Sequence, residues 1–204
     1  MQFGAVLETM AASIETITGA SADTDFNSQS AYVPRMYYKL LYRINGCDRY
    51  LLWYTNSDDR VLTDSSNRIL SFENEMKLDA FAQSASIVVQ PEAPILQNLD
   101  RVGLWVSNPG SAILAPDELL SVWNLLIDVA RSLGGEGSPF LKEDEDEQLS
   151  CLYDRLFWGT NPKALTPENL QFRPEWSASE LSMLAEHFGK GIDMFAGNLG
   201  DASV

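Results

Sequence analysis

The chain has 204 residues, of which 45% are hydrophobic and 10% aromatic, so it can fold around a substantial core. Its 29 Asp and Glu exceed its 14 Lys and Arg, which gives a formal charge of −15. This balance argues against direct nucleic-acid binding and against an anionic membrane surface, because both require clustered cations, and it favours a plain soluble protein or a basic protein partner.

The first predicted element is an amphipathic helix over residues 2–18, ended by Gly19. This helix could dock on the body of the protein or lie against a partner, and we expect docking. Residues 20–34 are polar and rich in turn formers, which predicts a loop. The apolar stripe of the helix consists of Phe3, Val6, Leu7, Met10, Ile14 and Ile17.

The strongest β signal is Asn45-Gly46, which lies between the aromatic and aliphatic runs at residues 36–44 and 49–54. Such a pair between two apolar runs predicts a β-hairpin. Neither face of the first strand is wholly polar, so we expect the sheet to be covered on most of both sides. Residues 61–62 and 68–72 are predicted to supply a third strand.

Three shorter elements complete the N-terminal half. A helix is expected from Ser71 or Glu73 to about Ser84, followed by a short strand at residues 87–89 that Pro91 stops. A short helix is expected near residues 99–106. Strands followed by a helix and another strand are typical of an α+β domain with an antiparallel sheet.

The C-terminal half is predicted to be helical. Pro116 occupies a first helical position and begins a helix that runs to about residue 133, before Gly134-Gly135. Residues 134–148 are predicted to be a flexible acidic loop, and residues 149–158 a helix.

A last helix is predicted from a capping box at Ser177 and Glu180 to about Phe195, followed by a loose tail over residues 197–204. Gly189 and Gly191 are places where this helix could kink. Taken together, the elements predict an α+β fold over residues 1–204, with an antiparallel sheet from the N-terminal half packed against helices mainly from the C-terminal half. We expect one domain, with a sheet-containing part (1–110) and a helical part (111–204) as a possible subdivision.

The sequence contains no recognisable catalytic or cofactor motif. Nothing pairs the single histidine, His187, with a nucleophile such as Cys151, so we interpret it as a structural or surface residue. Cys47 and Cys151 have no metal or redox spacing; reduced thiols are the simpler interpretation, with a disulfide left open. No signal peptide or membrane span is recognisable, and we expect a cytoplasmic protein that is not an enzyme and needs neither metal nor cofactor.

The motif Tyr153-Asp154-Arg155-Leu156-Phe157-Trp158-Gly159-x-Asn161, followed by Thr166-Pro167 and Phe172-x-Pro174-x-Trp176, resembles bacterial immunity proteins of contact-dependent and related polymorphic toxin systems. The resemblance covers mainly residues 117–195. It implies a small cytoplasmic protein without catalysis that binds one cognate toxin and covers its active site. Toxin domains of this kind are often basic nucleases, which an acidic inhibitor suits. The resemblance brings no binding motif, so it assigns no residue a role.

Our hypothesis is therefore an immunity protein that neutralises a basic toxin partner of the nuclease type. One alternative is an acidic nucleic-acid mimic from a phage or mobile element, which would inhibit a host defence enzyme. Another is an enzyme whose site the sequence does not reveal. The expected partner-binding residues are the acidic run Glu143, Asp144, Glu145, Asp146 and Glu147, a second acidic pair, Asp58 and Asp59, and the semi-exposed Trp158 and Trp176.

Overall fold

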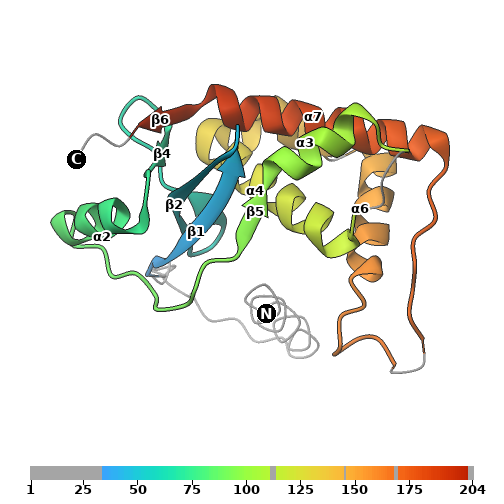
Figure 1. The fold of residues 1–204 in the computed structure, drawn as a ribbon, viewed down its shortest axis with the longest axis horizontal. Coiled ribbons are helices and arrows are strands. Elements are labelled where there is room, and N and C mark those ends of the chain that lie inside the picture. The colour runs from blue at the N-terminus through green and yellow to red at the C-terminus, as the bar shows by residue number, and fades with distance from the viewer. Residues whose placement is uncertain (1–33, 111–113, 145, 168–169, 202–204) are drawn as a thin grey trace, which may run out of the picture.

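The computed structural model describes residues 34–110, 114–144, 146–167 and 170–201 (Figure 1). The predicted helix at residues 2–18 lies outside these residues. The fold is α+β, as expected, with a mostly antiparallel sheet in the N-terminal half and helices mainly in the C-terminal half. The strands are β1 (Met36–Ile44), β2 (Cys47–Thr55), β3 (Asp59–Val61), β4 (Ile69–Ser71), β5 (Leu96–Asn98) and β6 (Leu199–Asp201). The helices are α2 (Glu75–Ser84), α3 (Leu99–Ser107), α4 (Pro116–Gly134), the 3₁₀ helix η1 (Gly135–Gly137), α5 (Pro139–Asp144), α6 (Glu147–Gly159) and α7 (Ala178–Gly197).

The predicted hairpin is confirmed and its turn has two residues. Asn45 and Gly46 have φ of 52° and 73°, the left-handed conformation that Asn and Gly tolerate best and that matches the twist of the strands. Asp100, in the first turn of α3, holds this turn, because its two carboxylate oxygens each accept a backbone N–H of the turn at 2.7 Å. The hairpin is thereby fixed to a helix more than fifty residues away in the chain.

The prediction of a single third strand is wrong, because its two segments belong to different sheets. Residues 59–61 form β3, which pairs antiparallel with β2, whereas residues 69–71 form β4, which leaves the main sheet and pairs with β6. The main sheet has the order β3-β2-β1-β5, and β5 is parallel to β1. The expected strand at residues 87–89 is reduced to a single bridge between Val89 and Tyr37.

Two predicted loops are partly ordered structure. Residues 199–201, expected in a loose tail, form β6, because β4 offers them a free strand edge. Residues 134–148, expected to be a flexible loop, contain η1 and α5. Phe140 explains the second difference: it is buried and packs on His187 with ring centroids 4.5 Å apart, which anchors α5 to α7.

Helix α2 covers one face of the main sheet, and the other helices lie on the opposite face. Figure 1 shows α7 along one edge of the molecule with α3 beside it, the sheet under its C-terminal half and α6 under its N-terminal half. The larger core cluster includes Tyr42 of β1, Trp123 of α4 and Phe195 of α7. A smaller cluster of Leu52, Phe72 and Leu78 lies on the opposite face, so the sheet is covered on both sides as expected.

Helix α7 runs unbroken through Gly189 and Gly191, the two glycines named as places where it could kink. A Cβ atom at Gly191 would lie 2.5 Å from Cδ1 of Leu126 and 3.0 Å from the ring of Phe140. Gly191 therefore serves to bring α7 close to α4 and α5 rather than to bend α7.

Candidate functional site

Helix α6, with its N-cap residue, carries three of the described residues that the sequence singles out for partner binding. Its first turn is fixed by Asp146, whose carboxylate accepts hydrogen bonds from the backbone N–H groups of Gln148 (2.8 Å) and Leu149 (3.3 Å). Asp is a preferred N-cap residue, and its charge suits the positive end of the helix dipole. Asp146 therefore has a structural role in addition to its charge.

The inner face of α6 is anchored in the core. Leu149, Leu152 and Leu156 recur at helical spacing and all three are buried, while Tyr153 beside them donates a hydrogen bond to Asn124 of α4 at 2.9 Å. Burying three Leu side chains contributes roughly 5–9 kcal/mol before the cost of ordering the chain. This packing fixes the direction in which the outer face points.

The outer face of α6 presents two carboxylates and an aromatic ring to solvent. Glu147, Asp154 and Trp158 follow one another at spacings of seven and four residues, so they share one side of the helix, and all three are exposed. At about 1.5 Å of rise per residue, Glu147 and Trp158 are separated by roughly 16 Å along the helix. Trp158 makes an edge-on contact with Phe157, with ring centroids 5.4 Å apart. We call these three residues the acidic face of α6.

The other predicted members of the acidic run precede this helix. Glu143 and Asp144 belong to the end of α5, and Glu145 lies outside the described residues. The run is thus divided between two helices, with Asp146 and Glu147 at the start of α6. The structure therefore brings Asp146, Glu147 and Trp158 onto one helix.

The remaining predicted residues lie elsewhere or pack against the protein itself. Asp58 and Asp59 lie at the turn into β3, next to the C-terminal end of α4, where Arg60 donates to the backbone oxygen of Arg131 at 2.5 Å. Asp58 lies 3.7 Å from the guanidinium of Arg60, so this carboxylate is partly neutralised. The structure thus separates the second acidic pair from the acidic face of α6.

Trp176 is a packing residue. It is half-buried against the main core, and the guanidinium of Arg155 lies 4.6 Å from its ring centroid. Arg155 also pairs with Glu180, whose pKa is lowered chiefly by the hydrogen bond from the backbone N–H of Ser177. Trp176 therefore packs the start of α7 against α6, and its role in partner binding stays a prediction.

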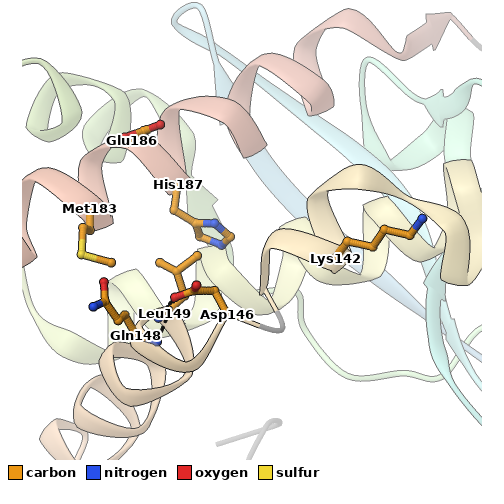
Figure 2. Close-up of a pocket in the computed structure, with 7 residues that line it drawn as sticks. All are labelled: Lys142, Asp146, Gln148, Leu149, Met183, Glu186 and His187. Atoms are coloured by element: carbon orange, nitrogen blue, oxygen red, sulfur yellow. Dashed lines mark hydrogen bonds between the residues drawn. The ribbon is translucent and has the colours of Figure 1, made fainter.

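A pocket of about 560 Å³ opens between α5, α6 and α7. Figure 2 shows the imidazole of His187 pointing from α7 towards Leu149 and Asp146 at the start of α6. The sequence placed His187 on the flank of its helix, but the residue is buried and lies between Phe140 and Trp123, with both ring centroids 4.5 Å away. The pocket is lined by Lys142, Asp146, Gln148, Leu149, Met183, Glu186 and His187.

The acidic residues of this pocket already have structural roles. Asp146 caps α6, and Glu186 forms an ion pair with Lys190 one turn along α7 at 3.0 Å. Cys151, the nucleophile candidate considered with His187, is exposed on α6 and does not line the pocket. The arrangement therefore contains an imidazole and two carboxylates but does not align them as a nucleophile, base and orienting acid.

Asp128 of α4 is a buried carboxyl that the sequence analysis missed. Its side chain accepts a hydrogen bond from Nε1 of Trp53 at 2.8 Å and lies 3.7 Å from the guanidinium of Arg131. Burial raises its pKa to about 7; the hydrogen bond from Trp53 opposes this rise, and the charge of Asp59 adds to it. One signal was visible in the sequence: an acid between Ile127 and Val129 on a strongly apolar helix.

Within the residues that the structure describes, no helix has the length and apolar character needed to cross a membrane. The same residues contain no group of three or more His, Cys, Asp and Glu that could hold a metal ion. Cys47 and Cys151 are both free and exposed, which resolves the open question of a disulfide between them.

These features define an α+β protein in which one well-anchored helix, α6, carries two carboxylates and a tryptophan on its exposed side. The chain matches no protein-family model, and no curated protein or solved structure is significantly similar to it.

Proposed function

We propose that this protein binds a basic protein partner through the acidic face of α6, and that the partner is a toxin domain whose active site it covers. The observation that carries the proposal is the outer face of α6, where Glu147, Asp154 and Trp158 are exposed on a helix whose other side is buried. Charged residues around an exposed aromatic side chain are a common composition for a protein–protein interface.

The charge that a partner would meet is negative because many of the cations are already paired within the protein. At least eight of the 14 Lys and Arg lie within 4 Å of a carboxylate, which leaves the surplus of acids facing solvent. A net charge of −15 would accelerate the encounter with a basic surface and weaken as salt is added. The paired cations are Lys39, Arg43, Arg60, Lys77, Arg101, Arg131, Arg155 and Lys190.

The inhibition follows from the chemistry of such a partner. A nuclease binds phosphates with clustered Lys and Arg, and carboxylates presented in a row on a rigid helix can occupy the same cations. Trp158, at the end of the row, would fill an apolar recess beside them. The protein would then act by occupying the site, without chemistry of its own.

The test is capture of the tagged protein from cells that co-express the products of the neighbouring genes. We expect a stoichiometric basic partner with the wild-type protein. A double variant, Glu147→Gln with Asp154→Asn, should associate several-fold more slowly at low salt, with a smaller change in the dissociation rate. Reversing the charges of residues 143–147 should lower the association rate further.

A matched control removes the same charge from another part of the surface. Glu92→Gln with Asp193→Asn changes two exposed carboxylates, so both double variants carry −15 + 2 = −13. If the two double variants bind alike, the net charge matters and the assignment to α6 is wrong. If no basic partner is recovered, the proposal itself fails.

Two alternatives have distinct outcomes in the same experiments. A captured host defence enzyme, in place of a toxin from the same gene cluster, would indicate a nucleic-acid mimic. The pocket at His187 is the observation that favours an enzyme. In that case purified protein should turn over a substrate, and His187→Gln should abolish turnover without abolishing folding.

A further inference from the structure

The segment between α6 and α7 is a loop with a closed neck. The side chain of Asn161 donates to the backbone oxygens of Gly159 and Phe172, both at 3.0 Å, and accepts the backbone N–H of Phe172 at 2.7 Å. Residues 161 and 172 are therefore held together although ten residues separate them, which is the geometry of an Ω-loop.

The neck is also tightly packed. A Cβ atom at Gly159 would lie 2.9 Å from the ring of Pro116 and 3.0 Å from Cδ of Pro174, so the returning chain passes directly beside the end of α6. Asn161 adopts a φ of 51°, a left-handed conformation that costs free energy for a non-glycine residue. The fold thus holds the two ends of this loop together.

The described residues of this loop include exposed apolar side chains. Leu165, Leu170 and Phe172 are 56%, 67% and 44% exposed, and Trp158, which precedes the neck, is 46% exposed. The backbone oxygen of Trp158 accepts the N–H of Asn161 at 3.1 Å, so Trp158 and Phe172 both lie at the neck. Exposed apolar groups in one segment, on a loop whose neck is closed, are a common mark of a binding surface. We call these four residues the apolar loop surface.

We propose that the apolar loop surface is the anchor that retains the same basic protein partner that the acidic face of α6 attracts. This inference rests on the proposed function and adds a second, chemically different contact to it. Trp158 belongs to both surfaces, so the acidic face of α6 leads directly into the apolar loop surface. The partner should present an apolar recess bordered by Lys and Arg.

Charge distinguishes this occupant from a second copy of the chain. Two copies would each carry −15 and would repel one another. Within the loop sequence, Lys163 and Arg173 balance Glu168 and Glu175, so the loop itself supplies contact area rather than electrostatic attraction. Attraction by carboxylates and retention by apolar side chains are then separable, since the first governs association and the second governs dissociation.

The experiment measures both rate constants with the purified basic protein recovered in the capture experiment. Leu165→Gln with Leu170→Gln removes two apolar side chains of the loop. The matched control, Met76→Gln with Leu104→Gln, changes two side chains that are 79% and 75% exposed on α2 and α3. We expect the loop variant to dissociate at least about 10-fold faster, with an unchanged association rate and salt dependence, and the control to match the wild type.

The outcomes separate this inference from the proposed function. If the wild type binds a basic partner and the loop variant dissociates no faster than the control, the anchor assignment is overturned while the proposed function stands. If the wild type binds no basic protein, both are overturned. Sedimentation of the protein alone completes the test: a dimer that the loop variant abolishes would make a second copy the occupant and overturn the inference.

Discussion

The carboxyl of Asp128 should make the stability of this protein fall as the pH rises. In the folded state the carboxyl is buried beside Trp53 and its pKa is about 7, against 3.8 for an exposed aspartate. A difference of one pKa unit corresponds to about 1.4 kcal/mol, so ionising Asp128 costs roughly 4 kcal/mol more in the folded protein than in the unfolded chain. The hydrogen bond from Trp53 and the ion pair with Arg131 limit this cost without removing it.

The direction follows from which state holds the proton. Below pH 3.8 the carboxyl is protonated in both states and contributes no pH dependence. Between pH 3.8 and about 7 the unfolded chain releases its proton and the folded protein keeps it, so the free energy of unfolding decreases as the pH rises. Above about pH 7 both states are ionised and the full cost of roughly 4 kcal/mol remains.

The variant Asp128→Asn tests this linkage. The amide oxygen can still accept the hydrogen bond from Trp53, and the side chain can no longer ionise. The stability of the variant relative to the wild type should increase from about pH 4 to about pH 8 by up to roughly 4 kcal/mol, or on the order of 10 °C in melting temperature. Urea unfolding at several pH values measures this difference, and Asp193→Asn controls for the loss of one surface charge.

A constant stability difference between Asp128→Asn and the wild type across this pH range would refute the reasoning. It would mean that the folded protein ionises Asp128 as readily as the unfolded chain does. The measurement that matters is the change with pH in the stability difference between the variant and the wild type. The stability difference at any one pH is less informative, because a buried amide can add a cost that does not vary with pH.

Three further substitutions test the packing and capping described above. Gly191→Ala should destabilise the protein by about 1–3 kcal/mol in denaturant unfolding, because its methyl group would overlap Leu126 and Phe140; an unchanged midpoint would show that α5 can shift. Asp146→Ala should cost about 1 kcal/mol and Asp146→Asn only a few tenths, since Asn caps a helix equally well; equal losses would assign the effect to charge. Asp100→Ala should cost about 1–3 kcal/mol and abolish hydrogen-exchange protection of the hairpin-turn amides, whereas retained protection would show that another group holds the turn.

Local signals predicted most of the elements. The hairpin follows from Asn45-Gly46, because Asn and Gly tolerate the left-handed conformation that its turn requires. Helix α7 begins at the capping box of Ser177 and Glu180, because both hydrogen bonds of that box form. Pro116 likewise marks the first turn of α4. Each of these signals depends on residues close together in the chain, so no knowledge of the fold was needed to interpret it.

The errors share a different physical origin. Residues 69–71 were predicted as part of a strand but with the wrong partner, and residues 199–201 were predicted as a tail, because these two segments pair only once the fold brings them together. Residues 134–148 looked like a solvated loop because Gly and acidic residues dominate them, yet Phe140 reaches a site on α7 that only the fold supplies.

For the candidate site, the sequence by itself determined the net charge of −15, the acidic run at residues 143–147 and the exposure expected of Trp158. Only the tertiary structure decided that Trp176 packs on Arg155 and that His187 and Asp128 are buried. The formal net charge is fixed by the composition and does not depend on how the chain folds. Burial, pairing and pKa depend on which distant residues pack around a side chain, and those contacts exist only once the chain has folded.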